Sequence, residues 1–114
     1  MKKKSTKHPR NGPWKQLYDN GQASVQGRYA DGKKVGLWKY FLRNGVVRAR
    51  GKYVAGNMTG VWRFHRESGA LWAVGHFKDN RQHGSWKRYK KDGSLEVEGR
   101  FVEGKLPGGW KKKK

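Results

Sequence analysis

The fold of this chain is decided by residues 36–59, which read GLWKYFLRNGVVRARGKYVAGNMT. The tryptophan in this stretch has a glycine two residues before it, and the same pair recurs at a fixed step of 24 residues. The tryptophans on this step are Trp14, Trp38, Trp62, Trp86 and Trp110. A constant period of this length is typical of tandem repeats that stack on their neighbours. The predicted repeat domain spans residues 12–110, with units 12–35, 36–59, 60–83 and 84–107 and a partial fifth at 108–110.

Each unit is predicted to form a β-hairpin followed by a second turn. The middle of each unit carries a pair that suits a two-residue type I′ turn, in which both central residues have positive φ. These pairs are Asn20-Gly21, Asn44-Gly45, Ser68-Gly69 and Asp92-Gly93. The second turns are expected at Asp31-Gly32, Ala55-Gly56, Asp79-Asn80 and Glu103-Gly104. Consecutive hairpins predict an all-β fold, an elongated single-layer antiparallel meander of stacked hairpins with eight or nine strands, spanning roughly 40 Å.

The two-residue turns also predict the strand register. Near the turns they pair Tyr18 with Ala23, Leu42 with Val47, and Lys90 with Leu95. Farther along, every repeat tryptophan lies opposite a glycine: Trp14 and Gly27, Trp38 and Gly51, Trp62 and Gly75, Trp86 and Gly99. A large ring can lie across the bare backbone of a glycine. We therefore predict a structural role for these eight residues.

The face opposite the tryptophans is predicted to carry rows of cations. Alternation places Lys39 opposite Arg50 and Phe41 opposite Arg48, with Arg43 beside the turn. Like charges placed directly opposite one another are destabilising, which favours an anionic partner or high exposure. The predicted polyanion-binding residues are Lys15, Arg28, Lys39, Arg43, Arg48, Arg50, Lys52, Arg63, Lys87 and Arg100. Lysines on strands also deter aggregation, so a single lysine can have a purely structural role.

The 114-residue chain has a formal net charge of +20, because 28 lysines and arginines face only 8 acidic residues. Nine of these cations lie in two basic tails, residues 1–11, which we expect to be flexible, and the lysine run 111–114. The other 19 still exceed the 8 acidic residues by 11. This surplus is larger than solubility requires and predicts an anionic partner.

Trp72 is the one tryptophan that lies off the 24-residue step. Strict alternation places it on the cationic face, opposite His65 and near Phe41. An exposed ring beside arginines can stack on a nucleic-acid base or a headgroup, so Trp72 and Phe41 are stacking candidates. The alternative is that Trp72 shields an apolar patch or joins a subunit contact.

Catalytic and metal sites are not expected. The sequence has no cysteine, and its four histidines lack the spacing of metal ligands. The acidic residues are scattered, and no nucleophile–base pair stands out. We therefore expect a non-enzymatic protein without a cofactor, a metal or a small-molecule substrate. No apolar run is long enough to span a membrane, and no apolar segment follows the basic start. A cytoplasmic location is expected, and a nuclear or membrane-peripheral one stays open.

The pattern Gly-x-Trp-Lys-x-x-x-x-Asn-Gly, followed by Gly-x-Tyr-x-x-Gly-x-x-x-Gly, resembles the MORN repeat, in the variant form of bacterial proteins labelled antitoxin-like. The positions that carry the resemblance are Gly12, Trp14, Tyr18, Asn20, Gly21, Gly27, Tyr29 and Gly32, with counterparts at steps of 24. Leu42, Arg66 and Lys90 depart from the Tyr18 position, and Asn80 replaces a turn glycine. The resemblance implies an elongated single-layer sheet without enzymatic activity, and roles in anionic lipid binding, protein scaffolding or dimerisation.

Three functions are compatible with these features. The leading hypothesis is sequence-independent binding of nucleic acid through phosphate contacts. The second is peripheral attachment to anionic lipid headgroups. The third is protein interaction, either as a homodimer formed through an edge strand or with an acidic partner such as a toxin.

Overall fold

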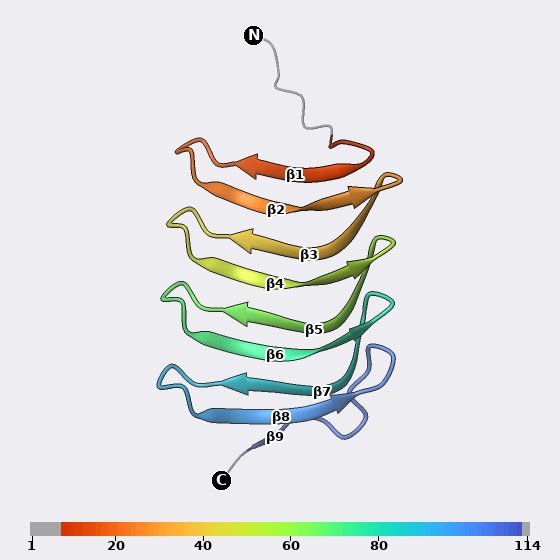
Figure 1. Cartoon of the computed structure of the whole chain (residues 1–114). Helices are drawn as coiled ribbons and strands as arrows, with labels where there is room; N and C mark the ends of the chain where they lie inside the picture. Colours follow the sequence, from red (N-terminus) through yellow and green to blue (C-terminus); the bar gives the residue numbers. More distant parts are fainter. Residues whose placement is uncertain (1–7, 113–114) are drawn as a thin grey trace.

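Nine β-strands follow one another in chain order through a single open antiparallel sheet in the computed structural model (Figure 1). The structure describes residues 8–112, so Lys2, Lys3, Lys4, Lys7, Lys113 and Lys114 of the predicted tails lie outside the described residues. The strands are β1 (Gly12–Leu17), β2 (Ala23–Ala30), β3 (Lys33–Phe41), β4 (Val47–Val54), β5 (Asn57–His65), β6 (Leu71–Lys78), β7 (Arg81–Tyr89), β8 (Leu95–Phe101) and β9 (Lys111–Lys112). The predicted all-β, single-layer meander is confirmed.

The molecule is elongated, because each strand packs mainly against its neighbours in the sequence. Its radius of gyration is 16.3 Å and its extents are 54 × 30 × 23 Å. A compact domain of this length has a radius of gyration of about 13 Å. The hairpins are thus stacked in one direction (Figure 1), and each hairpin depends on its neighbours for burial.

The two sets of turns differ from the predicted turn types. In the first hairpin, the Tyr18 amide donates to Gln22 and the Gly21 amide to Tyr18, at 2.7 and 3.0 Å. Only the glycine of each Asn-Gly-type pair has positive φ, so these are three-residue loops that end in a glycine bulge. The prediction of type I′ turns there was wrong. Both central residues have positive φ at the second turns instead, for example 48° at Ala55 and 86° at Gly56.

The longer loops change the pairing beside them. Leu17 pairs with Ala23, Phe41 with Val47, and Tyr89 with Leu95. The three predicted pairs near the turns were therefore wrong by one residue. A bulge follows in the second strand of each hairpin and shifts the register back. Residues without a partner at these bulges are Ser24, Arg48, Trp72 and Glu96.

The predicted tryptophan–glycine pairs are all present beyond these bulges. The rings, however, lie over the glycine of the preceding hairpin. A Cβ atom added to Gly51 would fall inside the ring of Trp62, and the same holds for Gly27 with Trp38 and Gly75 with Trp86. The tryptophans therefore join neighbouring units rather than the two strands of one hairpin.

A register shift between hairpins explains why each ring packs on the preceding hairpin. Between β2 and β3, the register shifts between Gln26 and Arg28, which opens the backbone ladder beside Gly27. The indole N–H of Trp38 donates to the Arg28 carbonyl at 3.2 Å. Trp62 and Trp86 bind the equivalent carbonyls in the same way, at 3.1 and 2.9 Å. Each indole thus supplies a hydrogen bond at a point where the strands cannot, as buried polar groups require.

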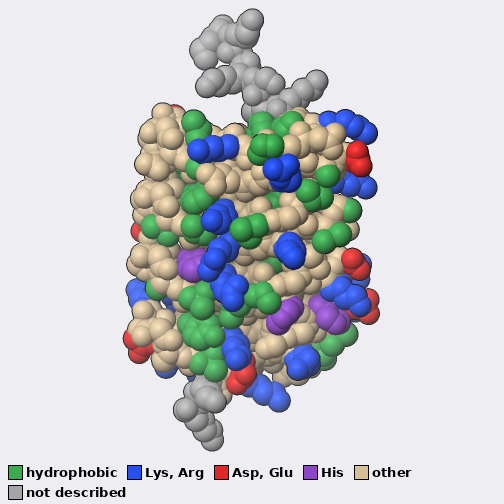
Figure 2. Space-filling view, viewed as in Figure 1, with side chains coloured by type: hydrophobic (Ala, Val, Ile, Leu, Met, Phe, Trp, Pro, Cys, Tyr) green, Lys and Arg blue, Asp and Glu red, His purple; other side chains and the backbone are tan. Residues whose placement is uncertain are grey.

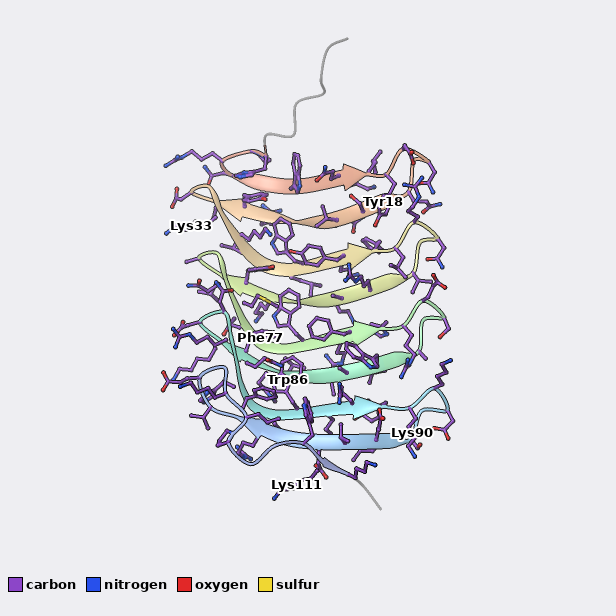
Figure 3. The ribbon with its side chains drawn as sticks, turned by 180° about the vertical axis from the view of Figure 1, so that it is seen from behind. Tyr18, Lys33, Phe77, Trp86, Lys90 and Lys111 are labelled. Atoms are coloured by element: carbon purple, nitrogen blue, oxygen red, sulfur yellow. The ribbon has the colours of Figure 1, made fainter. Side chains whose placement is uncertain are left out.

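The tryptophans and a column of Tyr or Phe residues form one continuous run of rings across the sheet. Successive rings meet edge to face, with centroids 5.1 to 6.4 Å apart. The run is Trp14, Tyr29, Trp38, Tyr53, Trp62, Phe77, Trp86, Phe101 and Trp110. Figure 3 shows this face, hereafter the ring face, from behind the view of Figure 1. Trp38 and Trp62 are each only 1% exposed, so this single layer of rings is the core of the protein.

Candidate polyanion-binding face

The face opposite the rings carries one row of side chains that crosses the sheet at its middle. Direct pairing on successive strands defines it. This central row consists of Lys15, Gln26, Lys39, Arg50, Arg63, Val74, Lys87, Glu98 and Lys111. Because side chains alternate along a strand, Lys39 and Trp38 lie on opposite faces. Figure 2 shows lysine and arginine side chains running across the middle of the face.

Lys39, Arg50 and Arg63 form the most concentrated part of this row. Lys39 pairs directly with Arg50, as predicted, and Arg50 pairs with Arg63. Side chains at such positions start about 5 Å apart. Among residues 8–112, the recorded ion pairs are Arg43 with Asp19 and Arg81 with Glu103, and neither involves the central row. The three cations therefore repel one another without an internal counter-charge.

The other end of the central row is closer to neutral. Glu98 pairs with Lys87 on one side and with Lys111 on the other. Lys111 and Lys112, which the sequence placed in a tail, form β9 and extend the sheet by one short strand. Positive charge is thus most concentrated over β3, β4 and β5, where an anion would be held most strongly.

A second column flanks the central row on the same face. Its members Arg28, Lys52, His76 and Arg100 are all exposed. Lys52 lies between Leu37 and Thr59, and Arg28 lies between Pro13 and Val35. The column therefore alternates cations with apolar or neutral side chains rather than with other charges.

Exposed aliphatic side chains share this face. Leu37 and Val54 are 57% and 58% exposed, and Leu17, Val61 and Val102 are also exposed. By alternation all five point away from the rings. A shallow depression of about 240 Å³ lies beside the most basic part and is lined by Lys39, Val46, Val47, Arg50, His65 and Gly69. Cations and apolar groups are therefore interleaved on one surface.

Three further predicted residues do not join the central row. Arg43 pairs with Asp19 of the preceding hairpin, and its guanidinium lies over the Tyr18 ring at 5.3 Å. Arg48 is left unpaired at a bulge, so Phe41 lies opposite Val47 and not opposite Arg48. Phe41 itself is half-buried, and its carbonyl accepts a hydrogen bond from the Tyr18 hydroxyl at 2.6 Å.

Trp72 does not lie opposite His65, which pairs with Leu71. The bulge adds one residue at Trp72 and interrupts the alternation of side chains. Trp72 borders a hollow on the ring face, together with Phe64, Phe77 and Trp86. The predicted pairing of Trp72 with His65 was therefore wrong. Trp72 is 39% exposed and, as a bulge residue, has no direct partner in the central row.

Two cations on the ring face were missed in the sequence. The Lys34 ammonium lies 5.0 and 5.1 Å from the ring centroids of Trp38 and Tyr53 and donates to the Tyr40 hydroxyl at 3.2 Å. The Arg88 guanidinium lies 4.7 Å from the Trp110 ring centroid. Both residues are an even number of positions from a repeat tryptophan, so alternation alone could have placed them on the ring face.

Burial changes the acidity of the two tyrosines beside Lys34. The Tyr40 and Tyr53 hydroxyls lie 2.8 Å apart. Burial, and then the hydrogen bond with Tyr40, raise the pKa of Tyr53 to about 12. Burial also raises the pKa of Tyr40. At neutral pH both hydroxyls are protonated, and the Tyr40 oxygen accepts the hydrogen bond from Lys34.

Metal-ligating side chains do not gather in the part of the chain that the structure describes. Within it, no three His, Asp or Glu side chains could together hold a metal ion. The described residues also include no helix long and apolar enough to cross a membrane.

Comparison with known families finds a match in the fourth hairpin. Residues 82–103, which cover most of β7, the whole of β8 and the turn between them, match the model of the family described as MORN repeat variant. No protein of curated function matches the chain significantly.

Proposed function

We propose that this protein, whose residues 82–103 form a MORN repeat variant, is a non-enzymatic module that binds polyanions, and foremost nucleic acid. The observation that carries this proposal is the run of Lys39, Arg50 and Arg63 on three adjacent strands without an internal counter-charge. Phosphates at this position would relieve the repulsion between the cations and release the counterions condensed on the nucleic acid.

The mode of binding follows from what lies on the cationic face. Phe41 is half-buried and Trp72 is a bulge residue outside the central row, so neither ring lies among its cations. Binding would therefore depend on phosphate contacts by the central row and by Arg28, Lys52 and Arg100. Contacts of this kind position a duplex without reading its sequence.

The proposal is tested by titrating a duplex of about 20 base pairs between about 50 and 200 mM salt. The triple variant Lys39→Gln, Arg50→Gln, Arg63→Gln is expected to reduce the slope of log K against log salt by about 3 units. The matched control is Lys90→Gln, Lys91→Gln, Lys105→Gln, which removes the same charge from exposed positions in the turns. A slope near zero for the wild-type protein, or equal losses in both variants, would overturn the proposal.

Peripheral binding to an anionic membrane is the second candidate, because exposed aliphatic side chains are interleaved with the cations. Leu37 and Val54 could enter the headgroup region while Lys39 and Lys52 meet acidic lipids. Sedimentation with vesicles that contain or lack phosphatidylserine separates the two functions. The variant Leu37→Ser, Val54→Ser should lose vesicle binding and keep duplex binding if the membrane is the target. If this variant bound vesicles and duplex DNA as well as the wild type does, nucleic acid would remain the better candidate.

A further inference from the structure

The ring face carries a hollow over β5, β6 and β7, on the side of the sheet away from the proposed polyanion site. It has a volume of about 290 Å³ and is lined by Phe64, Trp72, Ala73, Phe77, Gln82, Trp86, Arg88 and Trp110. Figure 3 shows Phe77 and Trp86 on this face, next to each other in the run of rings. Five of these eight lining residues are aromatic, and Gln82 and Arg88 are the two with a polar or charged end group.

A change in the repeat pattern produces this hollow. In the second and third units, the residue two positions after the tryptophan is a ring stacked on it: Tyr40 on Trp38 and Phe64 on Trp62, with centroids 6.3 and 6.4 Å apart. The fourth unit has Arg88 at this position, and its guanidinium lies over Trp110 instead. One ring of the stacked column is thus replaced by a cation at the edge of the hollow.

The residues around the hollow are also less polar than their counterparts in the second unit. In the second unit, the hydroxyls of Tyr40 and Tyr53 bind each other, and Tyr40 also binds the Lys34 ammonium. The residues 24 positions later are Phe64, Phe77 and Met58, which have no hydroxyl or ammonium. The hollow is therefore apolar where the second unit carries a closed polar network.

The guanidinium of Arg88 at the edge of the hollow has no acidic partner among the described residues. Within residues 8–112, the Nε of Arg88 is buried without an acceptor, and the guanidinium forms no recorded ion pair. A guanidinium binds a carboxylate more strongly than any neutral acceptor, because both partners are charged and two parallel bonds can form.

We propose that this hollow binds a small aromatic carboxylate. The ring of the ligand would lie against Phe64, Phe77 and Trp86, and its carboxylate would accept hydrogen bonds from Arg88 and Gln82. The charge and the aromatic walls complement these two ends of the ligand. A ligand of this size is expected to bind with a Kd of the order of 1 mM. This function does not depend on the polyanion-binding proposal.

The test uses phenylacetate as the probe, with 2-phenylethanol as the neutral ring and acetate as the anion without a ring. NMR of the indole N–H groups should show saturable shifts for phenylacetate at Trp86 and Trp110, weaker shifts for 2-phenylethanol and none for acetate. Arg88→Gln should raise the Kd for phenylacetate about tenfold, since one charged partner is lost. Arg88→Phe should restore the ring column, close the hollow and abolish binding without loss of thermal stability.

The two proposed sites can be separated with the same proteins. The triple variant at Lys39, Arg50 and Arg63 should bind phenylacetate as the wild type does, and Arg88→Phe should bind duplex DNA as the wild type does. If the wild-type protein bound phenylacetate but not DNA, only the polyanion-binding proposal would fail. If phenylacetate produced no saturable shift, or if Arg88→Phe bound it with unchanged Kd, the proposal would be overturned.

Discussion

At the scale of the residue, the protein depends on glycines that leave room for a ring. Gly27, Gly51 and Gly75 each lie beneath the tryptophan of the next hairpin, where no Cβ atom fits. These glycines have no positive φ, so the reason for glycine at these positions is space and not backbone conformation. The sequence predicted the tryptophan–glycine pairs correctly, since both columns have the same period. It did not predict which glycine each ring covers, because that depends on the register shift between hairpins.

We expect Gly51→Ala to destabilise the protein by about 2 to 3 kcal/mol, because the added methyl group displaces the Trp62 ring from a packed position. The matched control is Gly108→Ala, where a Cβ atom would meet nothing within 4 Å. Its effect should be below about 0.5 kcal/mol. Urea unfolding followed by tryptophan fluorescence measures both. Similar losses in the two variants would show that the ring does not need the bare backbone.

Tyr53 should give the protein an alkaline limit of stability. Its pKa is raised from 10.0 to about 12 in the folded state, so the folded protein holds this proton more tightly than the unfolded chain does. The resulting stabilisation is complete below pH 10 and is lost as the pH rises to about 12. It should amount to no more than about 2 kcal/mol.

Absorbance of the phenolate group during an alkaline titration checks this prediction. The wild-type protein should show one tyrosine that ionises near pH 12, and Tyr53→Phe should lack that step. Tyr18→Phe is the control, because it removes a tyrosine outside the Lys34 network and should leave the late step unchanged. If the late step persisted in Tyr53→Phe, the assignment to Tyr53 would be incorrect.

At the scale of the element, the turns explain where sequence reasoning succeeded and where it failed. Eight turn positions were predicted correctly, because glycine, asparagine and aspartate mark them, whereas the further turn at Pro107-Gly108 before β9 was not. The turn types were not, because Asn-Gly occurs both in two-residue loops and at the end of three-residue loops. The bulged residues Ser24, Arg48, Trp72 and Glu96 share no chemistry that would mark a bulge in the sequence. The predicted pairing of Trp72 with His65 failed for that reason, whereas Lys39 and Arg50 lie beyond the bulge and were paired correctly.

The second turns offer a stabilising substitution. Ala55 has a φ of 48°, a conformation that an alanine adopts only at an energetic cost. Ala55→Asn should raise the free energy of unfolding by about 0.5 to 1 kcal/mol, because asparagine tolerates this conformation better. The control Ala30→Asn changes an alanine in β2 that has no positive φ, and should not stabilise the protein. Thermal unfolding measures the Tm of both variants. Equal changes in Tm would contradict the idea that the positive φ of Ala55 is the source of the stabilisation.

At the scale of the whole molecule, the excess of positive charge has the largest influence. The chain carries +20, and the two ion pairs recorded among residues 8–112 are both exposed at turns. Self-repulsion of this size opposes the compact state, and salt screens it. The overall charge and the presence of a basic face were evident from the sequence. The three adjacent cations followed from the register. The hollow on the ring face could not be predicted, because its volume depends on how the side chains around Arg88 pack.

We expect the Tm of the protein to rise as NaCl increases toward about 0.15 M, over which range the Debye length shortens to about 8 Å. The triple variant at Lys39, Arg50 and Arg63 should have a higher Tm at low salt and a smaller rise, because the closest like charges are removed. Calorimetry at several salt concentrations gives both numbers. A Tm that does not change with salt in either protein would mean that repulsion on this face has no effect on stability.

The packing of each indole on the unit before it gives the molecule a direction. The Trp14 ring covers no glycine in the described chain, because no hairpin precedes it there. At the other end, Leu106 and Trp110 cover Gly99. Every contact between neighbouring hairpins inside the array packs a tryptophan on a glycine at the same separation in the sequence. A block of 24 residues could accordingly be removed or duplicated inside the array, and every remaining tryptophan would still pack on a glycine. Each such change would shorten or lengthen the central row by the same amount and leave the architecture unchanged.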